Sequence, residues 1–159
     1  HLLLLGYTSV GFLGAENGSH TGAERRRGYL KALAARGQQS DPSKIMLGPF
    51  TREAAAGMIR RADETGNLPR ALFCENDNLA IAAIEALMDL GYRVPADVAV
   101  IGFDDISWAG LHSLELTTVA QPIHEMGRQA LQMLVNTIES GAEQEPVILE
   151  PRLVVRKTT

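Results

Sequence analysis

The sequence predicts an α/β fold in which a parallel sheet carries helices on both of its faces. Between residues 9 and 103, short apolar runs alternate with longer amphipathic segments, giving four strands and three intervening helices. Consecutive parallel strands need crossover connections, and such crossovers are nearly always right-handed. The 159 residues and 45% hydrophobic content suffice for one substantial core in one or two compact units.

The first half of the chain supplies two strand–helix pairs. Leu2 to Gly6 indicates the end of a helix stopped by glycine. In the helix that ends before Gly37, the spacing turns Tyr29, Leu30 and Leu33 inward. The elements expected here are a strand at 9–13, a helix at 21–36, a strand at 45–47 and a helix at 51–64 with Thr51 as N-cap.

The second half continues the alternation and then changes character. A strand is expected at 70–74, a helix from an Asn76 or Asp77 cap to Leu90, and a strand at 98–103. A long amphipathic helix follows at about 124–139, ended by Gly141. Two short extended pieces at 147–149 and 153–155 flank Pro151.

Composition excludes several classes of protein for these residues. The formal net charge of −4 leaves no broad basic face for nucleic acid. Cys74 is the only cysteine, so an internal disulfide is excluded, which fits a reducing compartment. Apolar runs such as Leu2 to Leu5 are far too short to span a bilayer. No metal site or cofactor is expected, because the four histidines lack ligand spacing and nucleotide-binding and hydrolase motifs are missing.

Polar groups follow four predicted strands at the point where each ends. Because the carboxyl ends of adjacent parallel strands share one edge of a sheet, these groups are expected to converge on a single rim, where ligands bind in such folds. The groups lie at 14–25, Phe50, 75–77 and 104–105.

Most of these residues also have a plain structural explanation. Asp104 could cap a turn, and Asp105 is assigned that structural role. Arg25 belongs to a run of three arginines, which is usually a solvated helix face. Phe50 could plug the core or stack on a ligand, and Trp108 could anchor a partner or pack locally. A hydrolase using Asp104 with Asp77 stays open but ranks low, since no nucleophile or metal set accompanies the two acids.

Taken together, several motifs resemble the LacI/GalR family of bacterial transcription regulators. The resemblance extends over essentially the whole chain and is most specific in its last third. The matching motifs are GYTSVGFL (6–13), RRRGY (25–29), ALFCEND (71–77), GYRVPADV (91–98), VIGFDD (100–105), LTTVAQP (116–122) and LVVRKTT (153–159).

The resemblance implies a two-lobed effector-binding core of the periplasmic-binding-protein-like (type I) class. Residues 1–118 and 150–159 correspond to the C-terminal lobe, and 119–149 to a return segment of an N-terminal lobe that is mostly absent from this chain. Operator DNA would be bound only through a headpiece outside the chain, in a cytoplasmic protein.

The resemblance also assigns roles to individual residues. The effector, with a sugar as the leading candidate and a nucleobase or sugar acid still open, would be held by Arg25, Phe50, Asn76, Asp104, Gln121, Ser19 and Thr21. A homodimer would form through the helix after Phe50 and the loop 106–114, where Trp108 and Leu111 offer apolar anchors.

The expected function is therefore sensing rather than catalysis. Binding of a small effector between two lobes would change operator affinity, which requires different effector affinities in the open and closed states. The alternative is an extracytoplasmic sugar-binding protein of a transport system. A helix-turn-helix upstream of the chain would favour the regulator, and a signal peptide would favour the transport protein.

Overall fold

A four-stranded, fully parallel sheet organises the chain, with strand order β2-β1-β3-β4. The structure, a computed structural model, describes residues 1–16 and 20–159. The sheet and its crossovers comprise β1 (Val10–Ala15), α1 (His20–Ala34), η1 (Pro42–Lys44), β2 (Ile45–Gly48), α2 (Arg52–Glu64), β3 (Ala71–Cys74), α3 (Asp77–Asp89) and β4 (Ala99–Ile101). The remaining elements are η2 (Ser107–Gly110), β5 (Thr118–Ala120), α4 (Ile123–Ser140) and β6 (Arg152–Val154).

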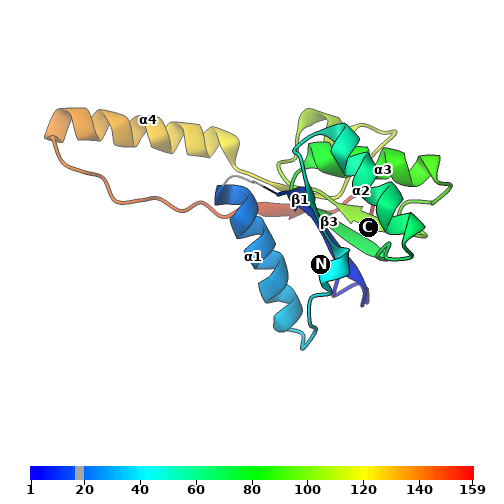
Figure 1. Ribbon diagram of the computed structural model, residues 1–159. Coiled ribbons are helices and arrows are strands. Elements are labelled where there is room, and N and C mark those ends of the chain that lie inside the picture. The colour runs from blue at the N-terminus through cyan, green and yellow to red at the C-terminus, as the bar shows by residue number, and fades with distance from the viewer. Residues whose placement is uncertain (17–19) are drawn as a thin grey trace.

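The two faces of the sheet carry separate cores because successive strand residues point to opposite sides. Leu13, Leu72 and Val100 pack with α2 and α3 in one cluster. Phe12 and Ile101 pack with the Tyr29 side of α1 in the other. Figure 1 shows α1 on one side of the sheet and α2 with α3 on the other. The predicted α/β class is confirmed.

Local sequence signals set the starts of two crossover helices. Thr51 Oγ1 accepts a hydrogen bond from Ala54 N at 3.2 Å, and Asn76 Oδ1 accepts one from Leu79 N at 2.9 Å. Asn76 is thus the N-cap of α3, which decides between the two candidates, and Asp77 is the first helical residue. On the opposite face, Tyr29 Oη donates to Val10 O at 2.9 Å and fastens α1 to β1.

The end of the chain returns to the sheet in an antiparallel pair. β5 pairs with β6, and isolated parallel bridges join Ile101 to Thr117 and Asp104 to Ala120. α4 extends away from the sheet and its covering helices (Figure 1). No residue of α4 is buried, and exposed apolar side chains line it: Ile123, Met126, Leu131, Leu134, Val135 and Ile138.

Three expected elements differ from the structure. Leu2 to Gly6 forms a single hydrogen-bonded turn instead of a helix end, although Gly6 has the positive φ of 90° expected of a stop residue. The strand expected at 98–103 pairs only from Ala99 to Ile101, because the backbone turns into the left-handed region at Asp104. Residues 147–149 form no strand, since only β6 finds a partner strand.

The search for membrane-spanning helices was negative: within residues 1–16 and 20–159, no helix combines the length and the apolar character needed to cross a bilayer.

Ile59 tests the core between α2 and the sheet. Its side chain is fully buried, so Ile59→Ala leaves a cavity and is expected to lower the free energy of unfolding by about 2–5 kcal/mol. Arg61→Ala, on the exposed face of the same helix, is the control and is expected to change it by no more than about 0.5 kcal/mol. Urea unfolding followed by circular dichroism measures both, and equal effects would contradict this packing.

Candidate functional site

The topology places a crevice at the carboxyl ends of β1 and β3. These strands are neighbours, yet the helices that follow them, α1 and α3, cover opposite faces of the sheet. The connections therefore diverge, and ligands in open α/β sheets bind at such a switch point. The groups expected to converge here do so from β1–α1, β3–α3 and the segment after β4.

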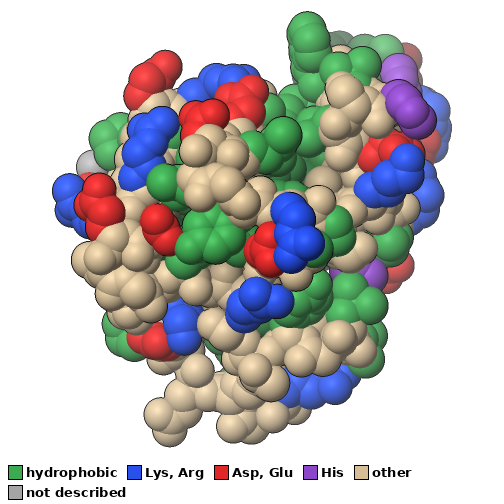
Figure 2. All heavy atoms as spheres, turned by 90° about the vertical axis from the view of Figure 1, so that its right-hand side faces the viewer, with side chains coloured by type: hydrophobic (Ala, Val, Ile, Leu, Met, Phe, Trp, Pro, Cys, Tyr) green, Lys and Arg blue, Asp and Glu red, His purple; other side chains and the backbone are tan. Residues whose placement is uncertain are grey.

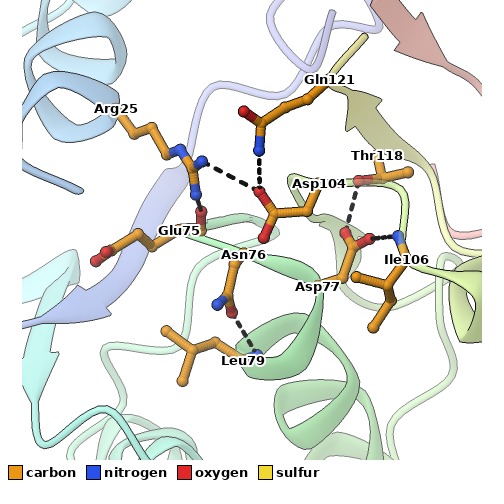
Figure 3. A network of polar contacts seen from close by, with 9 residues as sticks. All are labelled: Arg25, Glu75, Asn76, Asp77, Leu79, Asp104, Ile106, Thr118 and Gln121. Atoms are coloured by element: carbon orange, nitrogen blue, oxygen red, sulfur yellow. Dashed lines mark hydrogen bonds and ion pairs between the residues drawn. The ribbon is translucent and has the colours of Figure 1, made fainter. Parts of the chain in front are cut away.

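Arg25 crosses the crevice from α1. Its Nη1 donates to Glu75 O at 2.7 Å, and its Nη2 donates to Asp104 Oδ1 at 3.1 Å (Figure 3). The guanidinium also stacks on the Phe103 ring, with Cζ 3.9 Å from the ring centroid. Only 16% of the side chain is exposed. Arg25 is therefore the arginine of the run 25–27 that these contacts keep in a fixed orientation at the crevice.

Asp104 lies at the centre of the polar network. Its Oδ1 accepts from Arg25 and from Gln121 Nε2, the latter at 2.7 Å. Within the described residues, Oδ2 accepts no hydrogen bond, and 27% of the side chain is exposed. The backbone has a φ of 112°, which is rare for a residue with a Cβ, and Asp104 N is held by Val119 O at 2.9 Å. A strained residue with an unused acceptor is typical of a functional position.

Asn76 supplies a donor on the neighbouring segment. Its Oδ1 is used by the helix cap, whereas its Nδ2 makes no hydrogen bond with the described part of the chain. Asn76 follows β3 and Asp104 follows β4, two adjacent strands. The rim thus offers an amide donor after one strand and a carboxylate acceptor after the next, and the hydroxyl groups of a ligand can satisfy both kinds of group.

Asp77 is buried behind the rim and joins three segments. Thr118 Oγ1 donates to its Oδ1 at 2.5 Å, and Ile106 N donates to its Oδ2 at 2.9 Å (Figure 3). A Cβ at Gly102 would overlap Oδ1, so only glycine fits there. Burial raises the pKa of Asp77, against the lowering effect of both hydrogen bonds. With no exposed surface, Asp77 does not reach the crevice, which removes the Asp104–Asp77 acid pair as a catalytic arrangement.

Asp105 has the structural role expected of it. Its Oδ1 accepts from Arg156 Nη2 at 2.7 Å, and Arg156 Nη1 also donates to Leu116 O at 2.7 Å. This pair ties the last residues of the chain to the loop after β4.

The other predicted effector residues take varied positions. Phe50 follows β2 at the same sheet edge, and its ring is 53% exposed, which fits a stacking surface better than a core plug. Thr21 is exposed in the first turn of α1, and Ser19 lies outside the described residues. The groups that join Arg25, Asp104 and Gln121 are the Glu75 carbonyl and the Phe103 ring. Glu75 was expected at the rim but without a role in binding, and Phe103 was not expected there. Their only sequence signal is adjacency to Asn76 and Asp104.

The expected dimer anchors lie on a different face of the molecule. Trp108 and Leu111 are 65% and 46% exposed. With Met88 of α3 they border a hollow of about 890 Å³. Figure 2 shows the side of the molecule that carries α2 and α3, where hydrophobic side chains reach the surface among acidic and basic ones.

No group of three or more histidine, cysteine, aspartate or glutamate side chains in the described ranges could hold a metal ion.

Comparison with known proteins gives one family over the whole chain. The model of the periplasmic binding protein-like domain matches residues 1–159. The HTH-type transcriptional repressor PurR of Aliivibrio salmonicida is 32% identical over 159 residues, which are 99% of this chain and 48% of that protein. The chain spans about half the length of the curated relatives it matches.

Solved structures agree with this result. A transcriptional regulator CelR–cellobiose complex is 33% identical with a TM-score of 0.88, over 99% of this chain and 49% of that one. The Lac repressor bound to ONPG in the repressed state is 28% identical with a TM-score of 0.91, over 100% of this chain and 48% of that one.

The burial of Asp77 predicts a pH dependence. Between the ordinary pKa of 3.8 and the raised pKa, the folded protein binds more protons than the unfolded chain. The free energy of unfolding therefore falls through this window. Asp77→Asn removes the titration, so the stability advantage of the parent over this variant should shrink as the pH rises.

Denaturant unfolding of both proteins between about pH 4 and pH 7 measures this difference. Asp89→Asn, at a side chain that is 72% exposed, is the control and should leave the pH profile unchanged. An advantage of the parent that grows with pH would contradict the assignment.

Proposed function

The chain belongs to the periplasmic binding protein-like domain family, in the form found in LacI-type transcriptional regulators, and on that premise we propose that it is the effector-binding and dimerisation part of such a regulator. Its effector would be a small sugar that alters operator affinity from a distance. DNA would be bound by a segment outside this chain, and the protein would act in the cytoplasm without catalysing a reaction.

One observation carries the proposal: at the switch point, Asp104 Oδ2 and Asn76 Nδ2, which follow adjacent strands, make no hydrogen bond with the described part of the chain. A sugar hydroxyl donates one hydrogen bond and accepts others, so this pair suits it. Phe50 supports the same interpretation, since an exposed aromatic ring can stack on the apolar face of a sugar. The cellobiose complex of the similar CelR protein favours a sugar over a nucleobase.

The division of the chain follows from the same proposal. Residues 1–118 and 150–159 would form the C-terminal lobe, and 119–149, including α4, would belong to the second lobe. The exposed apolar side chains of α4 support this division, because a helix without any buried residue needs a partner surface. Gln121 would then connect the lobes, since it binds Asp104 at the start of the return segment.

A transport protein shares this cleft chemistry, but the matched relatives are transcriptional repressors and regulators. We therefore place the regulator first.

The effector site is tested by Arg25→Ala and Asp104→Ala in the intact protein. Asp104→Ala removes the acceptor and Arg25→Ala removes the cation that orients it, so the affinity for the tightest-binding sugar of a panel should fall about tenfold or more. Isothermal titration calorimetry with cellobiose, D-glucose, D-galactose and D-ribose measures this. Arg61→Ala, on the exposed face of α2, is the control. If both variants bind that sugar as tightly as the parent, the site is wrongly assigned.

We also propose that the exposed apolar face around Trp108 is a dimer interface. Trp108, Leu111 and Met88 leave large apolar side chains in solvent around one hollow, and tryptophan is enriched in interface hot spots. The beginning of α2 borders the same hollow through Arg52, which pairs with Glu85 of α3.

Light scattering coupled to size exclusion tests the dimer. The parent is expected to have the mass of a dimer at high micromolar concentration, and the double variant Trp108→Ala, Leu111→Ala that of a monomer, because the apolar anchors are lost. Leu4→Ala, at another exposed leucine, should remain dimeric. A monomeric parent would overturn the proposal.

A further inference from the structure

We propose that the rim accepts an uncharged, hydroxylated effector and rejects anionic ones, because the protein's own carboxylates already occupy both of its anion-binding features. The inference rests on the proposed effector site and names the charge class that this site accepts. It also makes Glu75 a specificity-determining residue beside Asp104.

The first anion-binding feature is the Arg25 guanidinium. Arginine holds a phosphate or carboxylate through parallel N–H groups. Here one terminal nitrogen donates to Glu75 O, the other donates to Asp104 Oδ1, and Phe103 covers one face. The charge of Arg25 is therefore balanced before any effector arrives. An anion would have to displace Asp104 or approach its free oxygen.

The second feature is the N-terminus of α1, where the helix dipole attracts anions. The Glu75 side chain lies against this first turn. Its Oε2 accepts a hydrogen bond from Ala15 N at 2.8 Å, and its Oε1 lies so close to Gly22, in the first turn of α1, that an added Cβ would overlap it. Glu75 is only 4% exposed, so this carboxylate is a fixed part of the wall.

The charges nearby leave a negative surplus. A small cavity beside Glu75 is bordered by Glu16 and Arg26, and Arg26 has no described carboxylate within 4.0 Å. The cavity lining thus carries two carboxylates, Glu16 and Glu75, against the single cation Arg26, while Arg25 is paired with Asp104, so one negative charge is in surplus. Partial burial strengthens repulsion between like charges relative to water.

An uncharged polyol meets none of these obstacles. Its hydroxyl groups can donate to Asp104 Oδ2 and accept from Asn76 Nδ2 without adding charge, whereas an anionic group brings a second negative charge to Asp104. Of the effector classes open from the sequence, the structure therefore favours the neutral sugar over the sugar acid.

Matched ligand pairs and two charge-removing variants test the inference in the intact protein. Calorimetry compares cellobiose, D-glucose, D-galactose and D-ribose with cellobionate, D-glucuronate, D-galacturonate and D-ribose 5-phosphate. The variant Glu75→Gln keeps an acceptor for Ala15 N but loses the charge, and Asp104→Asn loses the charge at the rim. Asp89→Asn changes the net charge equally at an exposed position. Circular dichroism checks that every variant is folded.

The parent should bind one uncharged sugar of the series. It should bind the anionic counterpart of that sugar at least about tenfold more weakly than the sugar itself. Glu75→Gln should reduce the difference in affinity between that sugar and its anionic counterpart at least about threefold relative to the parent. Asp104→Asn should weaken binding of the sugar and also reduce the difference in affinity between the two compounds. Asp89→Asn should leave this difference in affinity unchanged.

An anionic compound that binds the parent more tightly than its uncharged counterpart overturns the inference. A difference in affinity that neither Glu75→Gln nor Asp104→Asn reduces also overturns it. In both outcomes the proposed effector site itself survives. If no compound of either series binds, the proposed sugar-sensing function is overturned, and the inference falls with it.

Discussion

The buried carboxylate of Asp77 is the constraint on which the rest of the rim depends. Taking a carboxylate out of water is costly unless hydrogen bonds replace the lost solvation. Thr118 and Ile106 supply these bonds, and Phe103 O accepts from Asp77 N at 2.8 Å. Satisfying one group thereby fixes the start of α3 against the loop after β4 and against β5. The crevice residues Asn76 and Asp104 lie directly on the segments that this interaction joins.

The same segments connect the crevice to the two surfaces that lack partners. Ile106, which donates to Asp77, begins the loop that carries Trp108 and Leu111. Gln121, which donates to Asp104, lies just before α4. An effector that binds Asp104 Oδ2 would therefore lie one hydrogen bond away from Gln121 and the start of α4. A conformational response needs this kind of differential contact between ligand-free and ligand-bound states.

Contacts within the protein fix the polar groups of the crevice. Arg25 is fixed by two hydrogen bonds and by the Phe103 ring, and Asp104 is held in a backbone conformation that costs on the order of 1–3 kcal/mol. A site with fixed groups loses less conformational entropy on binding than a flexible one. Its selectivity then depends on which hydrogen-bonding atoms remain unused, and among the described residues these include Asp104 Oδ2 and Asn76 Nδ2.

The sequence by itself determined the α/β class, the order of the strands and helices, and the N-cap at Thr51, because apolar periodicity and capping are local properties of the chain. It also brought Arg25, Asn76 and Asp104 to one rim, since parallel strands end at one edge. Only the tertiary structure decided that Asn76 and not Asp77 is the cap of α3, that Asp77 is buried, and that Glu75 fills the start of α1. Burial and charge pairing depend on segments that are far apart in the chain, so a local sequence pattern does not predict them.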